Sequence, residues 1–499
     1  MRKLVAELKS LLTRGPLREG RFVRNVLTIL AGTAFAQAIS LAVMPILARL
    51  FAPEDFGLLA TFAALSNMLA MFACMSYQGA IILPKRQEAA FTLWITCIIM
   101  SVLMSMVFGV LIWLLDTNIV DWLGNPALLS WLWLVPVSVA AWGIFESTSL
   151  WCTRNKNFAD ISTAMVKRRL ALSGSQLALG LASATRSASG LIIGQVFGEL
   201  TGVAVIARKA LQHTPQRYWN SVRWQRISVL LHRYRRFPLY DLASSFAAAL
   251  SRAMPVIVLG IFFNPAIVGF FAMANRLVAA PMQLGVTSIT RVFFERANRA
   301  RLAGNLDTMT AEVYRRLVVI LMTPLALLAI AAPDLIVVLL GANWEESGYY
   351  LRWLALWFFF VSTASPLHRL FAVLERQDEL AIINGLLFIV STVALVIGGI
   401  LDDARTALAL FTTSASIVWF IQCLRVLRIA GVSATTLGSI LIREVLQALP
   451  YAAAMLAIQA FVDNRLVICA AAVGIGSIFA AARLRNIFAT PDNDSGPAS

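Results

Sequence analysis

Long apolar stretches separated by short loops dominate this chain, and its basic residues are divided unevenly between those loops. Of the 42 Lys and Arg residues, 35 fall in one set of alternate loops, which includes both chain ends. Two more lie inside apolar stretches, and the other set of loops holds only five. Because cytoplasmic loops of membrane proteins retain Lys and Arg, this asymmetry predicts a multi-pass membrane protein with both termini in the cytoplasm. The five basic residues in the other set of loops, predicted to be external, are Arg49, Arg186, Arg352, Arg405 and Arg465.

Composition supports this interpretation. Hydrophobic residues make up 59% of the chain and charged residues 14%, whereas soluble proteins carry about 25% charged residues. The net charge of +16 lies beside the predicted spans, where it would contact anionic lipid headgroups, so membrane lipids are expected partners and nucleic acid is not. The five cysteines are scattered without a CxxC pair, and we expect no disulfide, metal site or cofactor.

The apolar stretches predict an all-α fold of about 14 transmembrane helices. Residues 1–25 precede them as a basic cytoplasmic leader, predicted to be amphipathic. The fifth and sixth spans are short and polar; if they form a re-entrant pair instead, every later loop keeps its side. The predicted spans are 26–48, 56–83, 89–115, 127–151, 168–185, 188–207, 237–263, 266–290, 317–340, 351–371, 380–401, 405–424, 443–462 and 466–482.

A weak internal repeat divides the chain. A shift of 212 residues aligns the region of the first external turn with the turn after the seventh span, without a gap. Because both repeats begin on the cytoplasmic side, they predict two parallel six-helix lobes related by a pseudo-twofold axis along the membrane normal. The aligned identities are Leu47, Phe51, Pro53, Gly57 and Ala60 with Leu259, Phe263, Pro265, Gly269 and Ala272. The predicted division is an N-lobe at 26–207, a basic cytoplasmic linker at 208–236, a C-lobe at 237–428, two further spans within 440–483 and a cytoplasmic tail at 484–499.

Two segments carry a family resemblance. The run from Pro45 to Gly57, PILARLFAPEDFG, and the run from Ala80 to Lys85, AIILPK, resemble the oligosaccharide flippases of the multidrug/oligosaccharidyl-lipid/polysaccharide exporter superfamily. One departure from the family pattern is Ser76-Tyr77-Gln78. In close relatives, charged residues often flank the corresponding tyrosine. The resemblance implies two six-helix lobes around a cationic cavity, followed by two C-terminal helices. It also implies a polyprenyl-diphosphate-linked glycan as substrate, and it allows for partners among other polysaccharide assembly proteins.

Two arginines inside apolar spans are candidate substrate-binding residues. Arg252 and Arg276 lie about 11 residues on either side of the turn at 263–265, so each is about 16 Å from the outer surface. Cations at this depth are costly unless an anion accompanies them, and guanidinium groups bind the oxygens of a diphosphate bidentately. The alternative is that each arginine pairs with a buried carboxylate such as Glu146 or Glu199. Arg49, at the outer end of the first span, is either a third substrate-binding residue or an interfacial anchor.

Three acidic residues lie within or at the ends of spans, and each has two interpretations. Glu146, Glu199 and Asp241 could bind H⁺ or Na⁺ and so couple transport to an ion gradient, or they could neutralise the arginines. Glu199 also belongs to a stripe of glycines at 194, 198 and 202, a spacing typical of close helix packing.

These features predict a flippase of the bacterial cytoplasmic (inner) membrane that works by alternating access. It would move the lipid-linked oligosaccharide from the inner to the outer leaflet, for the biosynthesis of polysaccharide or lipopolysaccharide (O-antigen). A cation-coupled efflux exchanger for organic cations is the alternative within the same superfamily. A membrane glycosyltransferase or polysaccharide polymerase fits less well, because the external loops are too short to hold catalytic residues. We therefore expect no enzymatic activity.

Overall fold

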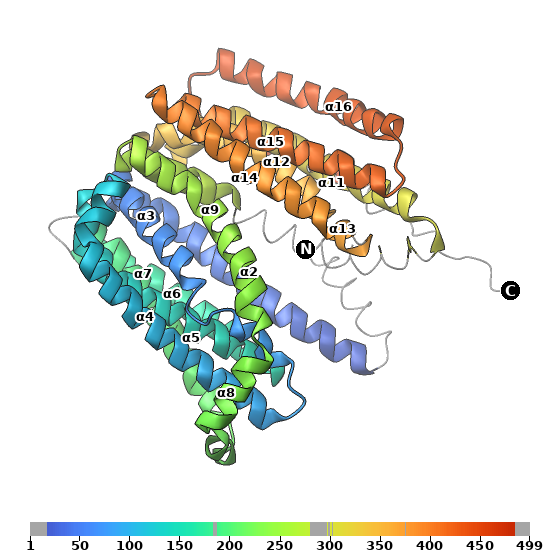
Figure 1. Ribbon diagram of the computed structural model, residues 1–499. Coiled ribbons are helices and arrows are strands. Elements are labelled where there is room, and N and C mark those ends of the chain that lie inside the picture. Colours follow the sequence, from blue (N-terminus) through green and yellow to red (C-terminus); the bar gives the residue numbers. More distant parts are fainter. Residues whose placement is uncertain are drawn as a thin grey trace. The chain divides into compact units, whose positions relative to one another are not determined.

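The computed structural model describes residues 17–182, 187–279, 303–374 and 376–484, together with residues 297, 300 and 301. These residues form helices connected by short turns, and the described part of the chain contains no strand (Figure 1). The prediction of an all-α fold is therefore confirmed. The chain divides into two compact units, residues 1–268 and 269–499, each of which has its own internal packing.

The described part of the first unit contains seven long α-helices and several short helices. Its longest helices, α2 and α4, exceed the roughly 20 residues that a bilayer requires. Residues 1–16 of the predicted leader lie outside the described residues, and its residues 17–25 form the first turns of α2. In chain order the helices are α2 (Leu17–Leu50), α3 (Pro53–Ala70), η1 (Tyr77–Ile82), α4 (Gln87–Leu123), η2 (Pro126–Leu134), α5 (Val135–Arg154), α6 (Phe158–Ala182), α7 (Ala188–Gln212), η3 (Gln216–Ser221), α8 (Trp224–Arg233), η4 (Phe237–Asp241) and α9 (Leu242–Phe262).

The second unit begins within a helix at Pro265–Ala279, which crosses the division between the units. In chain order its described helices are α11 (Leu306–Leu340), η5 (Ala342–Trp344), α12 (Glu345–Ala364), α13 (Arg369–Val373), α14 (Gln377–Ile400), α15 (Ala404–Ile429), α16 (Ala434–Phe461), α17 (Arg465–Phe479) and η6 (Ala480–Leu484). Helices α16 and α17 pack on α11, where Met455 and Ile468 meet Leu327 and Ala331 in a buried apolar cluster. They correspond to the last two predicted spans.

Ten of the described helices are long and apolar enough to cross a membrane. The chain is therefore a multi-pass membrane protein. The other four predicted spans correspond to helices that are shorter or more polar, namely α3, α6, α12 and the segment Pro265–Ala279.

The two turns of the internal repeat are built alike. Helix α2 ends at Leu50 and α3 begins at Pro53, just as α9 ends at Phe262 and the next helix begins at Pro265. The Phe51 N–H donates to the Leu47 carbonyl at 2.9 Å, and the equivalent bond from Phe263 to Leu259 measures 3.0 Å. Because proline lacks an N–H and has a helical φ, it suits the first helical position in both turns. The repeated sequence therefore encodes a repeated helix–turn–helix connection.

Phe51, in the first of these turns, is buried at the ends of two other helices. A Cβ atom on Gly180 of α6 would lie 2.7 Å from the Phe51 ring, and one on Gly190 of α7 would lie 3.1 Å from it. Only glycine leaves room for the ring at both positions. The sequence signature at residues 45–57 thus positions the ends of α6 and α7 against the end of α2.

The predicted linker at 208–236 is folded onto the first unit. Its helix α8 packs on α4, and Arg226 forms an ion pair of 3.3 Å with Glu88. The hydroxyl of Tyr77 donates to the Leu231 carbonyl at 3.1 Å. These contacts explain how a strongly basic segment between two spans adopts a fixed structure.

The turn between α14 and α15 shows how a charged loop residue orders a helix terminus. Asp403 caps α15 by accepting hydrogen bonds from the Arg405 N–H at 3.0 Å and the Thr406 hydroxyl at 2.5 Å. These bonds hold the pKa of the Asp403 carboxyl below its usual value, and the bond from the Thr406 hydroxyl has the largest effect. The adjacent Arg405 pairs with Glu346 of α12 at 2.6 Å, which ties together the ends of α12 and α15.

Candidate functional site

Helices α6 and α7 lie side by side and approach closely along the glycine stripe (Figure 1). A Cβ atom on Gly194 would lie 2.5 Å from Gln176 Cγ, and one on Gly198 would lie 2.5 Å from Leu172 Cβ. One on Gly202 would lie 3.0 Å from the Cβ of Arg168. Small residues at this spacing let two membrane helices pack backbone to backbone. The stripe is therefore a packing face, and it places Arg168 against α7.

Arg168 forms an ion pair with Glu199 inside this hairpin. The Arg168 Nη2 atom lies 3.7 Å from Glu199 Oε1, and the two side chains are 30% and 12% exposed. The amide of Gln195 donates to the same carboxylate oxygen at 2.7 Å, while Glu199 Oε2 is buried without a hydrogen bond. The guanidinium also lies over the ring of Phe145, with its Cζ atom 5.3 Å from the ring centroid. Arg168 is thus held by a cation–π contact and one long ion pair.

Arg168, Phe145 and Gln195 border a cavity of about 240 Å³ between α2, α5, α6 and α7. Of the described residues that line it, two carry a positive charge and none carries a negative charge. Polar amide and hydroxyl groups complete the wall beside apolar side chains. The lining residues are Thr33, Ala36, Gln37, Phe145, Met165, Arg168, Arg169, Leu172 and Gln195.

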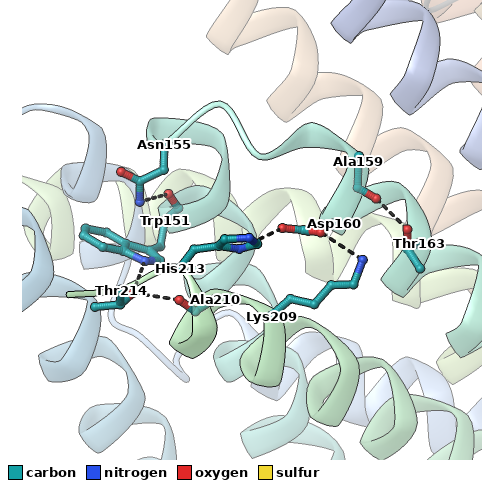
Figure 2. A network of polar contacts seen from close by, with 9 residues as sticks. All are labelled: Trp151, Asn155, Ala159, Asp160, Thr163, Lys209, Ala210, His213 and Thr214. Atoms are coloured by element: carbon teal, nitrogen blue, oxygen red, sulfur yellow. Dashed lines mark hydrogen bonds and ion pairs between the residues drawn. The ribbon is translucent and has the colours of Figure 1, made fainter. Parts of the chain in front are cut away.

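A polar network holds together the end of the α6–α7 pair that lies away from Phe51, as Figure 2 shows. Asp160, in the first turn of α6, accepts a hydrogen bond of 2.9 Å from Lys209 near the end of α7. Its second oxygen lies 3.4 Å from His213 Nδ1. The indole of Trp151, on α5, donates to the Thr214 hydroxyl at 3.3 Å. The network joins the ends of three helices that border the cavity.

The predicted substrate-binding arginines lie in different units. Arg252 belongs to the first unit, where it is exposed at the middle of α9 and has no hydrogen bond or ion pair with any residue that the structure describes. Arg276 belongs to the second unit, is half-buried, and has a polar or electrostatic contact of its own. Arg49 is exposed in the last turn of α2. The role of these three residues in substrate binding therefore stays a prediction.

The predicted acidic residues have different surroundings. Glu199 has Arg168 as its ion-pair partner. Glu146 is half-buried on α5 and forms no hydrogen bond or ion pair with the described residues. Asp241 is exposed at the end of η4, and the Ser244 hydroxyl donates to its backbone carbonyl at 3.0 Å.

Arg168 and Arg169 are not among the site residues predicted from the sequence. The predicted fifth span begins at 168, so both arginines count among those of the cytoplasmic loops. Helix α6 instead begins at Phe158, so Arg168 lies ten residues inside it. Asp160 could have revealed this start, because acidic residues favour the first turn of a helix. The apolar Ile161 and Ala164, three residues apart, continue the same helical pattern.

Together the fold and these charges define a class: a helical membrane protein with a cationic cavity inside its bundle, as transport proteins have. Residues 46–349 match the family described as Polysaccharide biosynthesis protein, and the chain belongs to this family. None of the curated proteins compared with the chain matches it significantly in sequence.

Solved structures with the same fold belong to flippases and multidrug transporters. The structure described as lipid II flippase MurJ in an inward closed conformation has a TM-score of 0.73 at 13% identity, covering 92% of this chain and 99% of the other. An inward-facing multidrug resistance MATE family transporter of the MOP superfamily has a TM-score of 0.60 at 13% identity, covering 80% and 94%. The chain thus has the fold of this superfamily, as the resemblance at residues 45–57 and 80–85 implied.

Proposed function

We propose that this protein is a flippase that moves a polyprenyl-diphosphate-linked oligosaccharide from the inner to the outer leaflet of the bacterial cytoplasmic membrane by alternating access. Its product would feed polysaccharide or lipopolysaccharide (O-antigen) assembly. The family match to polysaccharide biosynthesis and the fold shared with a lipid II flippase support this substrate class.

One observation in the structure carries the proposal. Arg252 lies ten residues after Leu242 and ten before Phe262, so it is at the centre of α9, and it has no partner among the described residues. A charged side chain at the centre of a membrane helix costs at least about 2.5–3.5 kcal/mol. A substrate with an anionic diphosphate would offset this cost, because guanidinium binds phosphate oxygens bidentately. Arg276 and Arg49 are proposed to contribute further contacts to the same substrate.

The test is glycan export in cells that depend on this gene. Replacing Arg252 or Arg276 with Ala should abolish export while leaving the amount of protein in the membrane unchanged, and Lys should restore part of it because it keeps the charge without the planar fork. The matched control is Arg443→Ala, which removes an exposed arginine of α16. Wild-type export by the Arg252→Ala, Arg276→Ala double variant would rule out these two residues as the diphosphate site.

Ion coupling belongs to the same proposal. Glu146 is the best placed of the three acids to bind H⁺ or Na⁺, because it is half-buried and has no described counter-ion. Glu199 is better suited to neutralising Arg168, which it contacts. The exposed Asp241 is the least suited of the three to hold an ion away from water.

The second candidate function is efflux of organic cations, because a multidrug transporter shares the fold. A cation site is usually built from carboxylates and aromatic rings, whereas the cavity of the first unit is lined by two guanidinium groups. An efflux assay with a cationic dye distinguishes the two functions. Dye efflux that depends on this protein, together with normal glycan export in its absence, would favour the exchanger.

A further inference from the structure

We propose that the cavity between α2, α5, α6 and α7 is an oxyanion subsite, in which Arg168 binds one phosphate group of a membrane lipid. The identity of that lipid rests on the proposed function, while the charge of the ligand rests on the cavity alone. The subsite lies within the first unit, and neither Arg252 nor Arg276 is among its lining residues.

The first argument is the charge of the cavity wall. Arg168 and Arg169 both line the cavity, and the described lining residues include no carboxylate. A cation entering this space would meet two guanidinium groups and, among the described lining residues, no carboxylate, so it would be repelled. An oxyanion would meet two groups with the geometry that binds phosphate best. The cavity therefore selects an anion.

The second argument is that Arg168 has unused hydrogen-bonding capacity. A guanidinium has five N–H donors. The Arg168 guanidinium makes no hydrogen bond with any described residue, since its contact with Glu199 is an ion pair of 3.7 Å, beyond the usual hydrogen-bond length. The guanidinium also lies 5.3 Å from the centroid of the Phe145 ring, a contact that leaves its N–H donors available to a ligand.

Glu199 acts as a resident counter-ion in this arrangement. It occupies Arg168 weakly, with one oxygen held by Gln195 at 2.7 Å and the other buried without a hydrogen bond. A phosphate that binds Arg168 bidentately would replace this long ion pair with shorter bonds. We therefore expect the carboxylate to compete with the ligand, which a purely structural ion pair would not do.

The size of the cavity limits what can enter. At about 240 Å³ it is smaller than the roughly 300–1,000 Å³ of pockets that enclose drug-sized ligands. It can accept a headgroup phosphate with some water, whereas a complete oligosaccharide must remain outside. Arg168 lies ten residues from the start of α6, or about 15 Å along the helix, so the phosphate would be well inside the bundle.

Binding of geranyl diphosphate to the purified full-length protein tests the proposal. The protein would be placed in nanodiscs of phosphatidylcholine, and the affinity measured by titration calorimetry. Arg168→Gln and Arg169→Gln should each weaken binding about 10- to 100-fold, as expected for loss of charge-assisted hydrogen bonds. The matched control is Lys167→Gln, which removes an exposed positive charge from the same helix turn and should leave the affinity unchanged.

Glu199→Gln gives the result that a structural role would not produce. Removing the competing carboxylate should strengthen binding, by about tenfold if the ion pair contributes on the order of 1.4 kcal/mol against the ligand. Because Arg168→Gln alone could destabilise the protein, the double variant Arg168→Gln, Glu199→Gln keeps the charges balanced and is compared with Glu199→Gln. An affinity equal to that of Glu199→Gln, in a double variant with a wild-type melting temperature, would overturn the proposal.

Two further arms identify the ligand and separate this proposal from the proposed function. If nanodiscs with phosphatidylglycerol abolish binding of geranyl diphosphate, the subsite binds the phosphate of an ordinary phospholipid; if they do not, it prefers the diphosphate. If Arg168→Gln weakens binding but leaves glycan export normal, the subsite is supported and its part in transport is rejected. If Arg168→Gln abolishes export but leaves binding unchanged, the subsite is overturned and the proposed function remains intact.

Discussion

Arg154 Nη2, at the end of α5, donates a hydrogen bond of 2.6 Å to the carbonyl of Pro84, in the loop that follows η1. The same guanidinium donates to the carbonyls of Ile81 at 3.3 Å and Ile82 at 2.7 Å, and its Nε atom donates to the side chain of Gln87 at 3.0 Å. Carbonyl groups at a helix end lack partners within the helix, and this one arginine supplies them. The second signature segment, residues 80–85, is therefore anchored by a residue 70 positions away.

Replacing Arg154 with Met should lower the free energy of unfolding by about 2 kcal/mol, because several charge-assisted hydrogen bonds are lost at a half-buried site. Thermal unfolding in detergent, followed by size-exclusion fluorescence, measures the effect. The control is Arg235→Met, at an exposed arginine of the linker. Equal melting temperatures for the two variants would show that Arg154 does not stabilise the loop.

Gly180→Ala should destabilise the protein by about 1–3 kcal/mol, because the new methyl group would lie 2.7 Å from the Phe51 ring. Gly174→Ala, on the same helix, meets nothing within 4 Å and should be neutral or slightly stabilising. Melting temperatures of both purified variants test the pair. The packing argument fails if Gly180→Ala is as stable as Gly174→Ala.

The two sides of the membrane can be assigned by cysteine labelling. In a cysteine-free background, single cysteines at 264, 343 and 402 should react with an impermeant maleimide in intact cells, since these positions are exposed in the short connections between long helices. A cysteine at 305, just before α11, should react only after permeabilisation. Labelling of residue 305 in intact cells would contradict the predicted orientation.

Ion coupling predicts different results for two acids. Glu146→Gln should leave substrate binding intact but make glycan export insensitive to collapse of the proton or sodium gradient. Glu199→Gln should keep that sensitivity, because its carboxylate serves Arg168. Export is compared with and without an ionophore, alongside the amount of protein in the membrane. An unchanged response to the ionophore in Glu146→Gln excludes this residue as the coupling site.

Most of the fold could be predicted from the sequence, because apolar length and loop charge are local signals. The turn at 263–265 is predicted by the apolar stretches on either side of it, and it has the same hydrogen-bond pattern as the turn at 51–53 that its sequence resembles. The starts of helices were harder. Helix α6 begins ten residues before its predicted span, because its first half is polar and its stabilising partners lie on α7.

The residues of the candidate site are harder to predict from the sequence than the helices are. A buried charge is visible in a sequence only when the residues around it are apolar, as they are around Arg252. Arg168 follows Lys167 and precedes Arg169, so it is typical of a cytoplasmic loop. Its neighbours Phe145 and Glu199 are distant in the chain, and only the folded hairpin brings them together.

The hairpin of α6 and α7 also bears on how this protein enters the membrane. Each arginine near the middle of a helix adds about 2.5–3.5 kcal/mol to the cost of insertion, so α6 is a poor candidate for entering the bilayer alone. Its counter-charge, Glu199, and its glycine packing face are both on α7, which is synthesised later. We therefore expect α6 to wait at the translocon until α7 emerges, so that the two helices partition into lipid as a pair.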